Sequence, residues 1–317
     1  MRAVWLREFG GPEVLVPGEA PDPVAGDGQA LIDVEFVNIT FVETQLRSGT
    51  GPAPVKLEPP VIPGNGVGGV VAAVGGGVDA GLVGRRVVSS TGGSGAYAEK
   101  VAVDAEGLFE VPDGLALDDA VALLADGRTA SMMVDAAGPR PGERVLVEAA
   151  AGGVGTLLVQ LAKARGAVVV AAAGGASKAE VAMGLGADEA VDYREAGWAG
   201  KAGAVDVVFD GVGGDVAREA FTLLRSGGRM VSFGLASGEW ASIPEEGAAE
   251  RGVTLVRPQA TPERLREFTV SALEEAAQGR LRPVIGRRFP LEDAADAHRA
   301  IQSRATVGKT LLEVRPG

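Results

Sequence analysis

The sequence predicts an α/β protein in which a doubly wound parallel sheet accompanies a mostly β module. Strands and helices alternate across residues 119–258, whereas strands separated only by turns occupy most of residues 1–118. The remaining residues, 259–317, hold a helix, an extended segment, a second helix and a last strand, and we expect them to return to the first module. A chain of 317 residues is long enough for two such domains.

Short runs rich in β-branched residues predict the strands of the first module. They lie at Ala3–Leu6, Gln29–Asn38, Gly66–Val74, Arg85–Ser89 and Tyr97–Val103. Clusters of glycine, proline and aspartate separate them and indicate turns. Phe41–Arg47 is the short helix that we expect here, and Gly49 ends it. Because no helix is needed between most of the strands, we predict a folded-over, barrel-like sheet.

The central region has the pattern of a parallel sheet with crossover helices. We expect strands at 144–149, 167–173, 189–192, 205–210, 229–234 and 252–256, and helices at 154–165, 177–185 and 215–225. Upstream, Leu117–Ala137 has helical spacing on two different faces, and we expect Asp126-Gly-Arg-Thr129 to interrupt it.

The tail begins with a well-marked helix start. Thr261-Pro-Glu263 supplies an N-cap hydroxyl, a proline at the first helical position and an acid in the first turn. Gly279 is expected to end this helix. We then predict an extended Val284–Pro290, a helical Leu291–Ser303 and a last strand at Thr310–Val314.

A glycine turn in the central region resembles a dinucleotide-binding fingerprint. Ala150-x-Gly152-x-x-Gly155 follows a buried strand and opens a helix, with alanine in the first glycine position. Gly152 would let the backbone approach a pyrophosphate, and Gly155 would let the helix pack closely on the strand. The phosphates would lie at the positive end of the helix that starts at Val154. The cofactor-binding residues expected in this turn are Ala151, Gly152, Gly153 and Val154.

The end of the second strand of the parallel sheet indicates which cofactor is bound. NAD-preferring sites place Asp or Glu there to hold the ribose hydroxyls, but this chain has Gly174-Gly-Ala-Ser-Lys178. An acid would repel a 2′-phosphate, whereas Ser177 and Lys178 would attract one. We therefore predict NADPH, with Gly174, Ser177 and Lys178 among its contacts. The alternative is that Ser177 is only the N-cap of a helix Lys178–Leu185 and that Lys178 is solvated.

Two further strands run into glycine turns. Asp206-Val-Val-Phe-Asp-Gly-Val-Gly-Gly214 and Met230-Val-Ser-Phe-Gly-Leu-Ala-Ser-Gly238 both end at the carboxyl edge of the sheet, where ligands of such folds bind. We expect Val212, Phe233 and Gly234 to contact the cofactor, the last two beside the nicotinamide. The alternative is that these are ordinary strand-ending glycines.

Composition excludes several functions. The chain has no cysteine, which rules out disulfides, thiolate catalysis and cysteine-bound zinc. Its one histidine, His298, is expected to be half-exposed on a helix. A net charge of −12 argues against a nucleic-acid partner. The sequence shows neither the apolar core of a signal peptide nor a run of 18 apolar residues, so we expect a cytoplasmic protein without a membrane partner.

These motifs together resemble the zinc-free quinone oxidoreductases, the ζ-crystallin-like group of the medium-chain dehydrogenase/reductase superfamily. The likeness extends nearly from end to end, and the order and spacing of the motifs carry it. They are Val37-Asn38 with Val42-Glu-Thr-Gln-Leu-Arg-Ser-Gly49, Pro63-Gly-Asn-Gly-Val-Gly-Gly69, Gly95-Ala-Tyr-Ala-Glu99, Ala150–Gly155, Gly186-Ala-Asp188 with Val191-Asp-Tyr193, Val231-Ser-Phe-Gly234, Pro283-Val-Ile, and Ser303-Arg-Ala-Thr-Val-Gly-Lys309.

The resemblance implies a central Rossmann domain, residues 119–258, and a GroES-like catalytic domain built from residues 1–118 and 259–317. It implies NADPH in the cleft between them and a homodimer formed through the Rossmann sheet edge. Lys178 and Tyr193 match residues that hold the 2′-phosphate. Thr129 matches a threonine near the nicotinamide, and Asn38 matches an asparagine on the substrate side.

The sequence also departs from this group. Tyrosines that often follow the asparagine are replaced by Gln45 and Gly51, and Arg128 is unexpected beside Thr129. Tyr97 lies in a motif that looks structural, so a tyrosine proton donor is not expected. The zinc-dependent alcohol dehydrogenases of the superfamily need cysteine and histidine ligands, which this chain lacks.

The leading hypothesis is an NADPH-dependent reductase of a quinone or an α,β-unsaturated carbonyl that works without zinc. Asn38 is the expected donor to the substrate oxygen, with Gln45 or Arg128 as further candidates. Two alternatives remain. One is an enoyl reductase dedicated to a biosynthetic pathway, and the other is an NADPH-binding protein of low activity with a structural or regulatory role.

Overall fold

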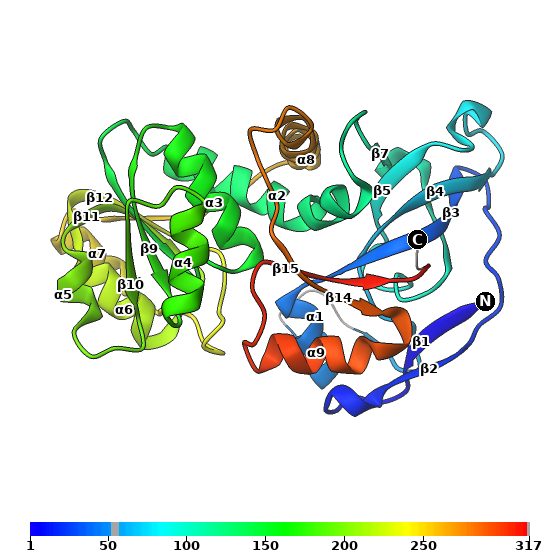
Figure 1. The fold of residues 1–317 in the computed structure, drawn as a ribbon, viewed down its shortest axis with the longest axis horizontal. Helices are drawn as coiled ribbons and strands as arrows, with labels where there is room; N and C mark the ends of the chain where they lie inside the picture. Colours follow the sequence, from blue (N-terminus) through cyan, green and yellow to red (C-terminus); the bar gives the residue numbers. More distant parts are fainter. Residues whose placement is uncertain (52–56, 316–317) are drawn as a thin grey trace. The chain divides into compact units, whose positions relative to one another are not determined.

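The computed structural model describes residues 1–51 and 57–315 and divides the chain into two units (Figure 1). The first comprises Met1–Ala125 together with Leu273–Gly317, and the second comprises Asp126–Ala272. Helices α2 (Leu117–Ala137) and α8 (Pro262–Ala277) each continue through a boundary between the units. The sequence had instead placed the boundaries at 118/119, near the start of α2, and at 258/259, before α8.

A seven-stranded sheet forms the body of the first unit, in the order β14-β15-β3-β4-β5-β7 with β6 paired to β3. The strands are β3 (Gln29–Ile39), β4 (Gly66–Val74), β5 (Arg86–Ser90), β6 (Lys100–Asp104), β7 (Phe109–Glu110), β14 (Ile285–Pro290) and β15 (Lys309–Glu313). A separate antiparallel pair consists of β1 (Arg2–Leu6) and β2 (Leu15–Glu19). Because β15 runs antiparallel to β3, with Leu311 opposite Asn38, the tail returns to the first module as predicted.

Short helices connect these strands. They are α1 (Phe41–Ser48), α9 (Ala294–Gln302) and the 3₁₀ turns η1 (Pro12–Val14), η2 (Ala80–Leu82), η3 (Ala105–Gly107) and η4 (Leu291–Asp293). A capping box starts α1, in which Thr40 and Glu43 satisfy each other's backbone N–H groups. Gly49 ends α1 with φ 81°, a left-handed conformation that favours glycine.

The second unit is a parallel sheet in the order β10-β9-β8-β11-β12-β13. Its strands are β8 (Arg144–Glu148), β9 (Val168–Ala173), β10 (Glu189–Asp192), β11 (Val205–Asp210), β12 (Leu224–Ser232) and β13 (Thr254–Val256). Its helices are α3 (Gly153–Ala164), α4 (Ala176–Gly184), α5 (Trp198–Ala202), α6 (Gly214–Thr222) and α7 (Glu245–Glu250). The strand order reverses between β8 and β11, so the ligand crevice of this fold lies at their carboxyl ends. The sequence had not predicted α5, α7, β2 or β7.

Helix α2 is continuous, so the predicted interruption at Asp126-Gly-Arg-Thr129 was wrong. A glycine in a helix interior costs only about 1 kcal/mol relative to alanine. Burial of the apolar residues on both sides outweighs that cost, since Leu123, Leu124 and Ala130 are all at most 3% exposed. Arg128 and Thr129 therefore project from a helix rather than from a loop.

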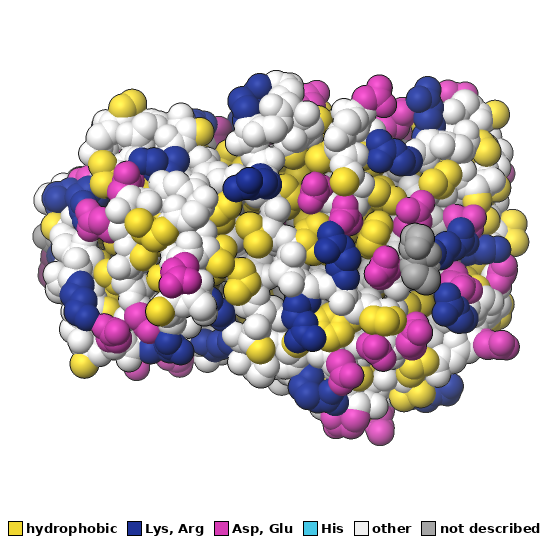
Figure 2. Space-filling view, viewed as in Figure 1, with side chains coloured by type: hydrophobic (Ala, Val, Ile, Leu, Met, Phe, Trp, Pro, Cys, Tyr) yellow, Lys and Arg dark blue, Asp and Glu magenta, His cyan; other side chains and the backbone are white. Residues whose placement is uncertain are grey.

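Each unit has its own aliphatic core. In the first, Ile32, Val34 and Leu312 are fully buried. In the second, Leu146 of β8, Val208 of β11 and Trp198 of α5 belong to one buried cluster. None of the described helices is long and apolar enough to cross a membrane. On the face seen in Figure 2, acidic and basic side chains are interspersed.

His298 is buried in α9, so the expectation of a half-exposed histidine was wrong. It lies on the inner face of the helix beside Ala294 and Ala297, and its Nε2 is 2.8 Å from Tyr97 Oη. Burial, and then the positive charge of Arg47, lower the pKa of His298 to about 3. A hydropathy pattern counts histidine as polar, whereas a neutral imidazole with a hydrogen-bond partner can be accommodated in a core.

The buried histidine predicts a loss of stability in acid. An unfolded chain protonates His298 near pH 6.5, while the folded chain resists protonation until about pH 3. The free energy of unfolding should therefore fall by about 1.4 kcal/mol for each pH unit below 6.5 from this group alone. Urea unfolding at pH 7.0, 5.5 and 4.5 should show a shallower decline for His298→Gln than for the wild type. Parallel declines would contradict this account.

Candidate functional site

The turn from β8 into α3 brings a helix N-terminus to the carboxyl edge of the sheet. A Cβ on Gly155 would collide with the carbonyl oxygen of Ala149, so only glycine allows this close approach of helix and strand. Ala149 itself has φ 47°, a strained value for a residue with a side chain. Gly152 is the N-cap, and the helix starts at Gly153 rather than at Val154 as predicted. Ala151, Gly152, Gly153 and Val154 thus surround a helix end suited to a pyrophosphate.

An acid that the sequence reading missed lies at this helix end. A Cβ on Gly153 would collide with Asp126 Oδ2, which places the carboxylate directly against the first turn of α3. Asp126 is only 8% exposed. A negative charge stabilises a helix N-terminus, but it also opposes a second anion at the same end. Its position in the middle of α2 gave no sequence signal of this proximity.

The end of β9 has glycines where an NAD site has an acid. Gly174 and Gly175 follow the strand, and Gly175 is the N-cap of α4 with φ 115°. Ser177 is therefore not the N-cap, which rules out that alternative for it, and it lies exposed in the first turn of the helix. Lys178 follows in the same turn and is partly buried.

Residues after β10 complete this corner. A Cβ on Gly174 would lie 3.0 Å from Tyr193 Oη, so the predicted Tyr193 is adjacent to the glycine pair. Arg194 also lies there, because a Cβ on Gly175 would collide with its guanidinium. Asp192 accepts from Arg194 Nη2 at 2.8 Å, which lowers the pKa of Asp192 to about 2. The sequence reading missed Arg194, although it directly follows the Val191-Asp-Tyr193 motif.

The turns after β11 and β12 are tied to each other. Phe233 N donates to Asp210 O at 2.8 Å, and Ser237 N donates to Val212 O at 2.7 Å. The Phe233 ring packs on Gly211, where a Cβ would lie 2.6 Å from Cζ. The predicted contacts Val212, Phe233 and Gly234 therefore form one cluster at the same edge as the α3 and α4 turns.

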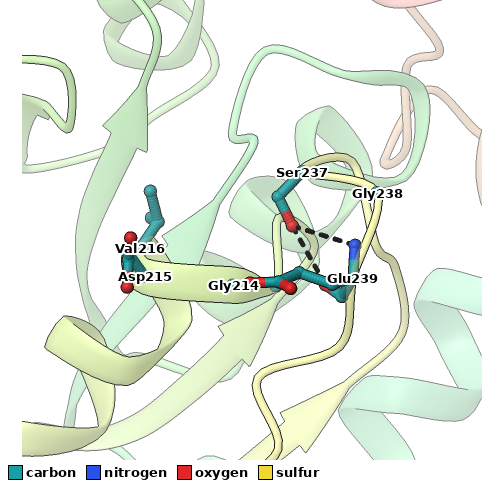
Figure 3. Close-up of a pocket in the computed structure, with 7 residues that line it drawn as sticks. Gly214, Asp215, Val216, Ser237, Gly238 and Glu239 are labelled. Carbon is teal, nitrogen blue, oxygen red and sulfur yellow. Dashed lines mark hydrogen bonds between the residues drawn. The ribbon is translucent and has the colours of Figure 1, made fainter.

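A pocket of about 450 Å³ opens next to this cluster (Figure 3). It is lined by Gly213, Gly214, Asp215, Val216, Ser237, Gly238 and Glu239. Ser237 Oγ donates to Glu239 O at 2.9 Å and closes the loop on one side. The two ionisable side chains of the lining, Asp215 and Glu239, are exposed carboxylates that both pair with Arg218. Because both are acidic, this pocket does not favour the binding of a phosphate.

The three residues proposed for catalysis fall in different units. Asn38 lies near the end of β3, is 2% exposed, and its amide is so close to Gly66 that a Cβ there would collide with it. Gln45 lies on α1, and its Oε1 is buried without a hydrogen-bond partner among the described residues. Arg128 belongs to the second unit, where burial lowers the pKa of its guanidinium and the charge of Asp126 opposes that effect. Thr129 is its neighbour on α2.

Two protein families match the chain. The alcohol dehydrogenase GroES-like domain family matches residues 26–113, and the zinc-binding dehydrogenase family matches residues 185–312. A probable quinone oxidoreductase of Schizosaccharomyces pombe is 39% identical over 310 residues, covering 94% of this chain and 92% of that protein. The chain belongs to the quinone oxidoreductases of the medium-chain dehydrogenase/reductase superfamily.

Two further proteins that are similar to this chain support the assignment to this superfamily. The crystal structure of Escherichia coli quinone oxidoreductase complexed with NADPH superposes with a TM-score of 0.90 at 31% identity, covering 99% of this chain and all of that one. A 2-haloacrylate reductase of a Burkholderia species is 31% identical over 328 residues, with 98% of each chain covered. The predicted α/β fold, with its GroES-like and Rossmann parts, is confirmed, and the protein is an oxidoreductase of this superfamily.

Because Asp126 places a negative charge at the N-terminus of α3, we expect it to weaken the binding of a dinucleotide cofactor. Asp126→Asn removes a negative charge from the pyrophosphate position and should tighten binding of NADPH and NADH alike. The gain should be about 0.5–1 kcal/mol, or roughly two- to fivefold in Kd. Fluorescence titration of both cofactors measures it. Asp135→Asn, on the same helix but ion-paired with Arg264, is the control. Unchanged or weaker binding by Asp126→Asn would show that Asp126 supports the cofactor site instead.

Proposed function

We propose that this oxidoreductase uses NADPH to reduce an electron-poor double bond, in a quinone or an α,β-unsaturated carbonyl, without zinc. The observation that carries the cofactor assignment is the corner formed by the ends of β9 and β10. Gly174 and Gly175 stand where an NAD site has an acid, and Lys178, Tyr193 and Arg194 gather around them.

Electrostatics at this corner favours a 2′-phosphate. The carboxylate of Asp192 lies at this corner, where it pairs with Arg194 and accepts a hydrogen bond from Gly175 N. Lys178 supplies a point charge, Ser177 and Tyr193 supply hydroxyl donors, and the first turn of α4 adds the positive end of a helix. The 62% exposed guanidinium of Arg194 has donors beyond those that Asp192 occupies, so it can serve a phosphate as well.

The proposed reduction does not require a strong general acid from the protein. NADPH would supply a hydride to the electron-poor carbon, and negative charge would then build on the conjugated oxygen. We assign the Asn38 amide to donate a hydrogen bond to that oxygen. Gln45 and Arg128 are the further candidates for this role. Protonation can come from water, because neither product requires a strong general acid.

The donor set argues against a catalytic zinc. Zinc enzymes of this superfamily use cysteine and histidine, and this chain has no cysteine and one histidine. That histidine is buried in α9 against Tyr97. Within residues 1–51 and 57–315, no three metal-ligating side chains of His, Cys, Asp or Glu converge.

The named relatives guide the choice of substrate. A quinone and a 2-haloacrylate share a carbon–carbon double bond conjugated to a carbonyl group, and both names occur among proteins similar to this chain over nearly its whole length. We also propose a homodimer formed through an edge of the parallel sheet, whose outer strands are β10 and β13.

Turnover with NADPH tests the proposed function. The purified protein should oxidise NADPH with members of a panel of quinones, free enones and enoyl thioesters. Asn38→Ala should lower kcat by on the order of 10- to 100-fold with little change in NADPH affinity, since it removes a donor to developing charge. A thioester preference would favour a biosynthetic enoyl reductase. Tight NADPH binding without any turnover would overturn the reductase proposal in favour of a structural or regulatory role.

Lys178 tests the cofactor assignment. Lys178→Ala should weaken NADPH binding by about tenfold or more and leave NADH binding nearly unchanged, because only NADPH carries the 2′-phosphate. Isothermal titration with both cofactors measures the difference. Lys201→Ala is the matched control, since Lys201 is an exposed lysine in α5 that pairs with Glu195. Equal losses for NADPH and NADH would remove Lys178 from the phosphate site.

A further inference from the structure

Two buried acids lie at the carboxyl ends of adjacent strands in the parallel sheet. Glu148 is the last residue of β8 and Asp210 is the last residue of β11. The two strands pair directly, with Val147 opposite Phe209. Both acids are 0% exposed. Glu148 immediately precedes the strained Ala149 of the dinucleotide turn, and Asp210 immediately precedes the turn that holds Val212.

The two carboxyl groups converge on one backbone N–H. Val212 N donates to Asp210 Oδ1 at 3.1 Å and to Glu148 Oε2 at 3.2 Å. Asp210 Oδ1 also accepts from Gly213 N at 2.7 Å, and its Oδ2 accepts from Ser232 Oγ at 2.7 Å. Glu148 and Asp210 thus join the ends of three neighbouring strands, β8, β11 and β12, beneath the glycine turns.

Among the residues that the structure describes, no Lys, Arg or His forms an ion pair or hydrogen bond with either carboxyl group. Burial, then the negative charge of Asp210 and a hydrogen bond between the two carboxyl groups, raise the pKa of Glu148 well above its usual value. The neighbouring strands present Ala172, opposite Glu148 on β9, and the neutral Ser232 on β12. A hydrogen bond between two carboxyl groups needs one proton between them, and the raised pKa of Glu148 favours Glu148 as the group that carries it.

We infer that Glu148 is a positioning residue for the nicotinamide half of the cofactor, because Glu148 and Asp210 both accept from Val212 N and so fix the 211–213 turn against the dinucleotide turn. This inference rests on the proposed NADPH-dependent function. The 211–213 turn in turn holds the next one, since Ala236 N and Ser237 N donate to Gly211 O and Val212 O. Loss of the shared proton would leave negative charges on both Glu148 and Asp210, where the dinucleotide turn and the 211–213 turn begin.

The positioning role predicts an alkaline loss of cofactor affinity that a neutral isostere abolishes. For the wild type, Kd for NADPH should rise about tenfold or more from pH 7 to alkaline pH, because loss of the proton leaves two adjacent buried negative charges. Glu148→Gln keeps a donor toward Asp210 without an ionisable proton. Its Kd at pH 7 should stay within about threefold of the wild type and remain flat with pH.

Three further binding measurements distinguish a positioning role of Glu148 from a general loss of structure. Adenosine 2′-monophosphate carries the 2′-phosphate but neither the pyrophosphate nor the nicotinamide, so it tests the Lys178 corner alone. Its Kd should be the same for wild type and Glu148→Gln at every pH. Asp210→Asn removes the acceptor charge and should also flatten the NADPH profile, which covers the case in which Glu148→Gln does not fold. Glu189→Gln, an exposed acid on β10, should retain the wild-type profile.

The outcomes distinguish this inference from the function on which it rests. If the wild type fails to bind NADPH, the proposed function falls and the inference falls with it. If the wild type binds NADPH and the pH profiles of wild type, Glu148→Gln and Asp210→Asn coincide, the proposed function stands and the positioning role is refuted. A pH-dependent loss of affinity for adenosine 2′-monophosphate that matches the loss for NADPH would also refute it, because the 2′-phosphate corner would then be changing as well.

Discussion

The close contact between β8 and α3 is the constraint on which the rest of the site depends. A side chain at Gly155 would push the helix away from Ala149, and the helix N-terminus would then no longer reach the strand ends. The same approach forces Ala149 into a left-handed backbone conformation, a local cost of order 1 kcal/mol or more that the surrounding packing must offset. Glu148, one residue earlier, is thereby held at the edge where the glycine turns meet.

The charges at this edge follow a consistent division. Acids lie beneath or beside the glycine turns, where Asp126, Glu148 and Asp210 are all buried. At the corner formed by the ends of β9 and β10, Arg194 lies against Gly175 and pairs with Asp192, and Lys178 follows in the first turn of α4. A dinucleotide phosphate at α3 would therefore be bound mainly by backbone N–H groups and the helix dipole. A 2′-phosphate would instead be bound by side chains, so discrimination between the two cofactors is concentrated in that corner.

The sequence predicted the helices and strands whose positions follow from hydrophobic periodicity and from glycines in turns. The β11 and β10 strands match the predicted ranges, and the return of the tail to β3 was foreseen. It could not predict contacts between elements distant in the chain. Asp126 lies in the middle of a helix and carried no sign of its neighbour Gly153, and nothing in an amphipathic pattern reveals that His298 faces Tyr97. The Glu148–Asp210 pair was equally invisible, because each acid alone looks like an ordinary strand end.

The absence of an available phenol shapes what this enzyme can do. Both tyrosines of the chain have other contacts. Tyr97 is buried and forms a hydrogen bond with His298, and Tyr193 lies against Gly174. Burial raises the pKa of Tyr97 far above its ordinary value, which makes it a weak proton donor. The proposed substrate-side groups Asn38 and Gln45 are amides, which do not titrate. A pH dependence of turnover near neutrality would then arise from groups other than these two amides.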